Sequence, residues 1–199
     1  MLSWQKILVA SGITAFMLAA FIGPFMSHPA YSSVSHSVSE LAGQNMPNAW
    51  IMRTGFVAFG GATMIAALSR LRADPAVSST LCVFGAAMIA AAVWSHLPIA
   101  AAGGGERMEN DLHSVAASVM GVAFASACAA RLWTQRTHHR AQAQIDWLSA
   151  AGLVIAIGVP LLMLQFPAVA GVLQRGMFLF SFVWVFRAFG RGAAGGMAA

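Results

Sequence analysis

Charged residues are scarce in this chain. Only 9% of its residues are Asp, Glu, Lys or Arg, against roughly 25% in soluble globular proteins. Hydrophobic residues make up 59% of the sequence, and its mean hydropathy is +0.73. The stretch Ile7–Met26 carries no formal charge at all. This composition excludes an ordinary soluble domain and indicates a multi-pass membrane protein.

Cysteine is scarce too, and the usual catalytic motifs are missing. Cys82 and Cys128 fall near the cytoplasmic ends of predicted helices, so we expect packing residues and no disulfide. The chain has no His-Glu-x-x-His pattern and no nucleophile elbow, and its last two predicted helices contain no His. No motif therefore dictates a reaction, and the distribution of His argues against a haem protein.

The apolar runs predict an all-α fold, a bundle of six transmembrane helices. At about 1.5 Å rise per residue, each run is long enough to cross a hydrocarbon core about 30 Å thick. The predicted spans are Ile7–Met26, Ala49–Leu68, Ala76–Pro98, Leu112–Leu132, Trp147–Phe166 and Val172–Phe189. We expect one six-helix domain over residues 1–191 and a flexible Gly/Ala-rich tail over residues 192–199.

Basic residues predict how this bundle is oriented. With the N terminus in the cytoplasm, eight Lys and Arg residues lie inside, and only Arg53, Arg107 and Arg175 lie outside. Both termini are then cytoplasmic, and we expect a protein of a bacterial-type cytoplasmic membrane. The net charge of +5 follows from this topology. It indicates contact with anionic inner-leaflet lipids and requires no nucleic-acid partner. The oligomeric state is not predicted.

Small residues at a spacing of three or four predict close contacts between helices. The first span has such a row: Gly12, Ala15, Ala19 and Gly23. The fourth span has another, which His113 extends by one turn: Ala117, Gly121, Ala125 and Ala129. We therefore expect His113 to face protein and Gly121 to permit a close backbone approach. Pro160 is expected to kink the fifth span.

The connection Ser27–Asn48 is the longer of two outer loops that hold polar residues. Within it, Val34, Val38 and Leu41 recur at helical spacing. Two interpretations remain open for this segment. It is either a short amphipathic helix at the outer interface or a solvated, serine-rich loop.

Several short motifs, taken in order, resemble a known family. They are Tyr31-Ser-Ser-Val-Ser-His-Ser-Val-Ser-Glu-Leu, then Pro47-Asn48-Ala49-Trp50-Ile51-Met52, Gly55-Phe56, Leu112-His113 and Gly171-Val172-Leu173-Gln174-Arg175. Together they resemble the prokaryotic membrane family called domain of unknown function 998. The resemblance implies a compact polytopic helical bundle and no assigned activity. One departure is that Pro98 is followed by Ile99, where family members often have an acidic residue. A mechanism that needs this carboxylate is in doubt, unless Glu109 or Asp111 replaces it.

Ionisable residues gather at the predicted outer helix ends and in the outer loops. They are Glu40, Arg53, His96, Glu109, Asp111, His113 and Arg175. Ionisable groups near a bilayer are functional candidates, because one at its centre costs about 2.5–3.5 kcal/mol on insertion scales. The structural alternative is that these groups pair with one another and hold the loops against the helices.

Three classes of function remain open. The first is a membrane-embedded enzyme acting on a lipid or other amphiphile, with Glu40 and His113 as acid and base. In a second form of this hypothesis a divalent metal is bound by four ligands: His113, Glu40, His96 and Asp111. Headgroup-binding residues are then Arg53, Arg175, Ser39 and Gln174. The other two classes are a transporter or binding protein for a small solute or lipid and an accessory component without catalysis.

Overall fold

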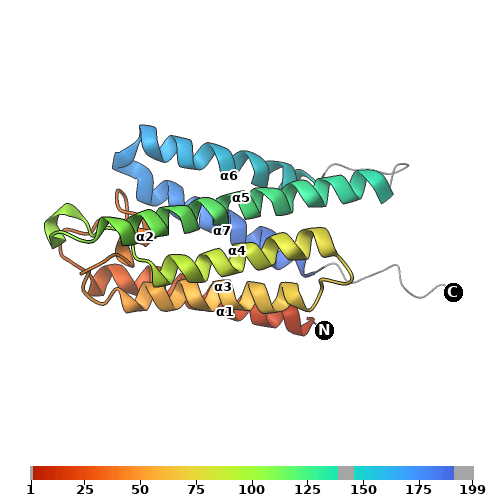
Figure 1. The fold of residues 1–199 in the computed structure, drawn as a ribbon, viewed down its shortest axis with the longest axis horizontal. Coiled ribbons are helices and arrows are strands. Elements are labelled where there is room, and N and C mark those ends of the chain that lie inside the picture. The colour runs from red at the N-terminus through yellow and green to blue at the C-terminus, as the bar shows by residue number, and fades with distance from the viewer. Residues whose placement is uncertain (1, 139–145, 191–199) are drawn as a thin grey trace.

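The computed structural model describes residues 2–138 and 146–190, and throughout them the fold is helical, without a strand (Figure 1). The α-helices are α1 (Trp4–Ile22), α2 (Val38–Leu41), α3 (Trp50–Leu68), α4 (Pro75–Val93), α5 (Arg107–His138), α6 (Trp147–Gln165) and α7 (Ala170–Ala188). Six of these are long and apolar enough to cross a membrane, whereas α2 is a single turn. The prediction of six spans is confirmed. The predicted tail over residues 192–199 lies outside the described residues.

The long helices lie side by side and alternate in direction along the bundle (Figure 1). Helices α1, α3, α4 and α5 pack in chain order, α6 packs on α5 and α7, and α7 also contacts α1. One end of the bundle, here called the terminal end, holds the start of α1, the end of α7 and the α3–α4 turn. The opposite end, the α2 end, holds α2 and the α4–α5 and α6–α7 connections.

Glycines permit the closest approaches between helices. A Cβ atom on Gly12 of α1 would lie 2.8 Å from the Cβ of Ala62 in α3. A Cβ atom on Gly60 of α3 would lie 2.7 Å from the carbonyl oxygen of Gly85 in α4. Because lipid tails give no hydrophobic drive for association, such close packing holds these helices together. The small-residue row predicted in the first span does mark an interface.

The core is built mainly from phenylalanine rings. Phe16 of α1 packs edge-on against Phe56 and Phe59 of α3 and against Phe182 of α7, at centroid distances of 5.3, 6.2 and 5.1 Å. Phe178 of α7 lies 4.8 Å from Phe16. Edge-to-face rings at these distances attract beyond the area that they bury. Helix α7 is therefore tied to α1 and α3 near the middle of the bundle.

The prediction of a close backbone approach at Gly121 is wrong. A Cβ atom there would have nothing within 4 Å. The buried positions of α5 besides His113 are instead Ala116, Ala123, Phe124, Ala127 and Cys128. Residues spaced by four drift about 40° around a helix at every step, so a long row of this kind leaves the interface. His113 itself is 2% exposed and does face protein.

Two predicted boundaries also differ from the structure. The span predicted to end at Pro98 ends at Val93, because side chains of α5 bind the backbone N–H groups of Ser95 and Leu97. The span predicted to end at Leu132 continues as α5, through polar residues, as far as His138. Charged and polar residues form helix readily where no apolar face is required.

The segment Tyr31–Leu41 fits neither interpretation drawn from its sequence. Its helical part is confined to Val38–Leu41, which is too short for an interfacial helix. Val38 and Leu41 are 0% and 2% exposed, so the segment is not a solvated loop either. It folds into the α2 end of the bundle.

Candidate functional site

Arg175, at the start of α7, fastens the Tyr31–Leu41 segment to the bundle. Its Nη1 donates to the carbonyl oxygens of Ser33, His36 and Gly171 at 2.8–3.0 Å. Its Nη2 donates to the hydroxyl of Tyr31 at 2.7 Å. Gly171 completes this contact, because a Cβ atom there would collide with the carbonyl oxygens of Ser33 and His36. The Gly-x-x-Gln-Arg sequence of α7 is thus a docking element for the segment.

Tyr31 lies at the centre of this contact. Its hydroxyl donates toward the carbonyl oxygens of Ser37, at 2.9 Å, and His36, at 3.2 Å. Burial raises the pKa of the Tyr31 phenol, and the nearby guanidinium of Arg175 opposes this shift. The Tyr31 side chain is therefore a neutral phenol where the Tyr31–Leu41 segment contacts α7.

Glu40 closes the first turn of α2. Its Oε2 accepts from the backbone N–H of Ser37 at 2.6 Å, while the Ser37 hydroxyl accepts from the N–H of Glu40 at 3.1 Å. This reciprocal pair is a capping box. Arg53 of α3 closes the other end of α2, where its Nε and Nη2 donate to the carbonyl oxygens of Ala42 and Gly43 at 2.9 and 3.1 Å.

His113 holds the end of α4. Its Nδ1 lies 3.0 Å from the carbonyl oxygen of Ala91 and 2.8 Å from that of Trp94. Both partners are acceptors, so the hydrogen must be on Nδ1. The His96 ring stands edge-on to it at 5.4 Å.

Gln44, which no sequence pattern singles out, links three segments at this end. Its side chain is 8% exposed. Its Nε2 donates to the carbonyl oxygens of Ser95 and Glu106, and its Oε1 accepts from the N–H of Glu106. Its backbone N–H donates to the carbonyl oxygen of His96. A glutamine inside a loop carries no signal of such burial. Glu109, at the start of α5, adds a bond from the N–H of Ser95 at 2.7 Å.

The predicted metal ligands do not assemble. Among the residues that the structure describes, no group of three or more His, Cys, Asp or Glu side chains is placed to hold a metal ion. His96 and His113 are neighbours, but Glu40 is engaged in the capping box and Asp111 is exposed on α5. The four ligands do not converge, because Glu40 and His113 bind backbone groups of different helices and Asp111 faces outward.

A cavity of about 470 Å³ lies among α5, α6 and α7, and is here called the α5–α7 cavity. Its walls include Phe84, Met120, Gly121, Pro160, Met163 and Met177. None of the residues that line it is charged, and Ser39 and Gln174 contribute polar groups from the α2 end. Helix α6 packs loosely here, with 11% of its span buried against 50% for α3 and α4. Pro160 frees the carbonyl of Ala156, another wall residue.

Gln174 and Ser39 present unused hydrogen-bonding groups to this cavity. The Oε1 of Gln174 accepts from the backbone N–H of Val38 at 2.8 Å, which fixes the amide and leaves its NH₂ group toward other partners. Neither this NH₂ group nor the Ser39 hydroxyl has a hydrogen-bond partner within residues 2–138 and 146–190. Both residues were among the predicted headgroup-binding residues, and the structure brings them to one cavity.

A second hollow of about 380 Å³, the α1–α7 groove, lies on the other side of α7. It is lined by Phe16, Ala20, Phe21 and Phe25 of the α1 segment, and by Ser33 and Arg175. Phe178 borders both the groove and the α5–α7 cavity. The consecutive residues Gln174 and Arg175 therefore serve two separate hollows.

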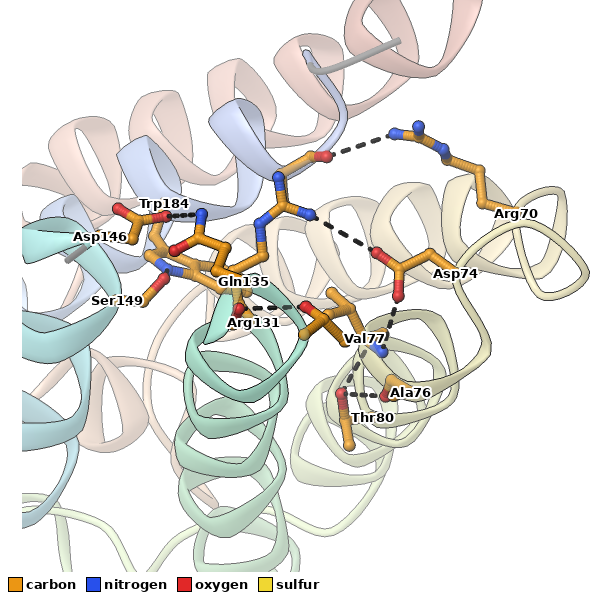
Figure 2. A network of polar contacts seen from close by, with 12 residues as sticks. Arg70, Asp74, Ala76, Val77, Thr80, Arg131, Gln135, Asp146, Ser149 and Trp184 are labelled. Carbon is orange, nitrogen blue, oxygen red and sulfur yellow. Dashed lines mark hydrogen bonds and ion pairs between the residues drawn. The ribbon is translucent and has the colours of Figure 1, made fainter. Parts of the chain in front are cut away.

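Polar contacts at the terminal end fasten the helices that surround the cavity (Figure 2). Arg131 of α5 pairs with Asp74, the N-cap of α4, at 3.6 Å. The indole N–H of Trp184 in α7 donates to the hydroxyl of Ser149 in α6 at 2.9 Å, and both side chains are buried. Helix α6 is thus held by side-chain contacts at the terminal end, and it borders the α5–α7 cavity toward the α2 end.

These features define a polytopic helical membrane protein with a partly open, uncharged cavity among α5, α6 and α7. No curated protein and no solved structure matches the chain. The profile of one family, described as "Protein of unknown function (DUF998)", matches residues 9–189. The chain therefore belongs to this family, the one that its sequence resembles.

Proposed function

We propose that this protein binds a single-chain amphiphile, a molecule with one alkyl tail and an uncharged headgroup, in the α5–α7 cavity. The observation that carries the proposal is the pairing of an apolar cavity with two unused polar groups at one end, Ser39 and Gln174. The alkyl tail lies among the Phe and Met side chains of the walls. The Ser39 hydroxyl and the Gln174 amide bind the headgroup.

The dimensions and charge of the cavity favour this ligand class. Pockets of about 300–1,000 Å³ hold drug-sized ligands, so a cavity of about 470 Å³ suits one chain better than a two-chain phospholipid. The lining residues carry no charge, which disfavours an ionic headgroup. The loosely packed α6 gives the ligand a lateral route from the bilayer.

The orientation belongs to the proposal as well. The excess of Lys and Arg on one side of the spans supports an N terminus in the cytoplasm of a bacterial-type cell. The α2 end then faces outward, and the ligand enters from the outer leaflet. Basic residues at the terminal end contact anionic lipids of the inner leaflet.

An enzyme built on Glu40 and His113 has less support. The Glu40 carboxylate caps α2, and the Nδ1 of His113 is engaged by two backbone carbonyls. A transporter remains the second candidate, because Pro160 interrupts α6 beside the cavity and gives that helix a point of bending. Both candidates need the same binding site.

Lipid analysis of the purified protein tests the proposal. After extensive detergent exchange, wild-type protein should retain a stoichiometric neutral single-chain amphiphile that mass spectrometry identifies. Gly121→Phe, which projects a ring into the cavity, should lose it. Gly61→Phe is the matched control, because Gly61 also has open space around it but lies on α3, away from the cavity. Equal retention by both folded variants, or no bound amphiphile in the wild type, would refute the proposal.

A further inference from the structure

The α1–α7 groove has a feature that the α5–α7 cavity lacks, a cationic side chain at its end. Arg175 and Ser33 lie where the groove meets the Tyr31–Leu41 segment. The exposed rim of the groove consists of Met17, Phe21 and Phe25, which are 41%, 70% and 80% exposed. The groove therefore joins an apolar channel on the membrane-facing surface to a guanidinium group.

The guanidinium of Arg175 has two donors to spare. It carries five N–H groups. Three carbonyl oxygens occupy both hydrogens of Nη1, and the Tyr31 hydroxyl takes one from Nη2. Nε–H has no acceptor in the described part of the chain, and Nη2 has one, the Tyr31 hydroxyl. Nε and Nη2 form the edge of the group that binds two oxygens of a carboxylate or phosphate at once.

Arg53 illustrates the use of that same edge within this fold. Its Nε and Nη2 donate to two successive backbone carbonyls, those of Ala42 and Gly43. In Arg175 the Nε of the corresponding edge has no acceptor among the described residues, and Nη2 keeps a second hydrogen besides the one that it donates to Tyr31.

Within residues 2–138 and 146–190, the charge of Arg175 has no counterion. Arg175 forms no ion pair with any residue that the structure describes. The nearest candidate on the segment, Glu40, directs its Oε2 to the N–H of Ser37. A cation at the membrane surface without an acidic partner attracts anionic headgroups, at about 1 kcal/mol per residue.

We propose that the α1–α7 groove binds an anionic phospholipid from the leaflet at the α2 end. Its phosphate accepts from Nε and Nη2 of Arg175, and one acyl chain lies along the groove between Phe16 and Phe25. The ligand differs from that of the α5–α7 cavity, from which Phe178 separates the groove. The bound lipid also reinforces the attachment of the Tyr31–Leu41 segment to α7.

The test compares spin-labelled phosphatidylglycerol and phosphatidylcholine of identical chains on the full-length protein in bilayers. Wild-type protein should prefer phosphatidylglycerol by about fivefold, the ratio that corresponds to one basic residue. Ala20→Leu, which fills the groove without touching Arg175, should abolish the preference. Thr14→Leu is the control, an exposed position of α1 outside the groove, and should retain it.

Further variants separate the headgroup contact from a general loss of structure. Arg175→Gln should remove the preference, and Arg175→Lys should retain part of it, because Lys keeps the charge but not the two-pronged edge. Inorganic phosphate at millimolar concentration should not compete, whereas competition would identify a free-anion site and overturn the lipid assignment. A wild type without preference, or a preference unchanged in Ala20→Leu, would also overturn it. Gly121→Phe should leave the preference intact, so this test is independent of the α5–α7 cavity.

Discussion

The Nδ1 of His113 lies 2.8 Å from the carbonyl oxygen of Trp94, so a side chain of α5 closes the end of α4. The same nitrogen reaches the carbonyl of Ala91. Because His113 is almost fully buried, its ring orders the junction of two membrane helices. His113, which the sequence presents as a candidate acid or base, therefore caps the end of α4.

His113→Ala should therefore destabilise the protein. The substitution leaves two helix-end carbonyls without their donor, at a cost of roughly 1–3 kcal/mol for a buried group. Thermal unfolding in detergent measures this effect, and Ser114→Ala, on the exposed side of the same turn, should be nearly neutral. An unchanged unfolding midpoint with loss of ligand binding would instead make His113 a functional residue.

Glu40→Gln should be tolerated, because Gln can also complete a capping box. Both the unfolding midpoint and amphiphile retention should remain near wild type. Ser37→Ala, which removes the hydroxyl cap of α2, should cost about 0.5–2 kcal/mol. Full stability with no amphiphile bound in Glu40→Gln would contradict the structural role and restore a carboxylate-dependent site.

The stability of the α2 end should depend on alkaline pH through Tyr31. Its pKa is raised in the folded state, so folding favours the neutral phenol. This contribution is complete below the ordinary tyrosine pKa of about 10 and is lost as the pH rises through the higher folded value. Tyr31 is the only tyrosine, so the ultraviolet absorbance of tyrosinate reports it alone. A titration at or below the ordinary value would show that the phenol is not buried.

The proposed orientation predicts which engineered cysteines react in intact cells. Cysteines at Ser33 and Gly104 should react with a membrane-impermeant thiol reagent, and one at Thr137 should not. The wild-type chain, with Cys82 and Cys128 inside membrane-spanning helices, is the unlabelled control. The reverse pattern would place the α2 end in the cytoplasm.

Much of the fold was predictable because hydrophobic length and charge distribution fix the number of spans. The six helices, the inward-facing His113 and the small-residue contact at Gly12 follow from such patterns. The close contact expected at Gly121 is absent from the structure. Residues spaced by four drift away from the buried face of a long helix, so the pattern could not predict this contact correctly.

The candidate site was harder to predict, because a sequence shows its titratable residues but does not show where the helices leave a cavity. Glu40, Arg53 and His113 bind backbone groups that helix ends and tight loops leave unpaired, a need that only the folded chain reveals. The α5–α7 cavity arises from the loose packing of α6, which no residue pattern signals. Ser39 and Gln174 were predicted as headgroup-binding residues, but the cavity that they line was not predicted.

The most direct test of the amphiphile-binding proposal is photoaffinity mapping with a single-chain probe that carries a photoreactive group near the end of its tail. We predict crosslinks to the residues that line the α5–α7 cavity farthest from Ser39 and Gln174, above all Phe124, Ala156 and Ser181. Excess neutral single-chain amphiphile should suppress these crosslinks, and Gly121→Phe should remove them. Crosslinks confined to membrane-facing residues such as Val154, which is 71% exposed, would contradict the account.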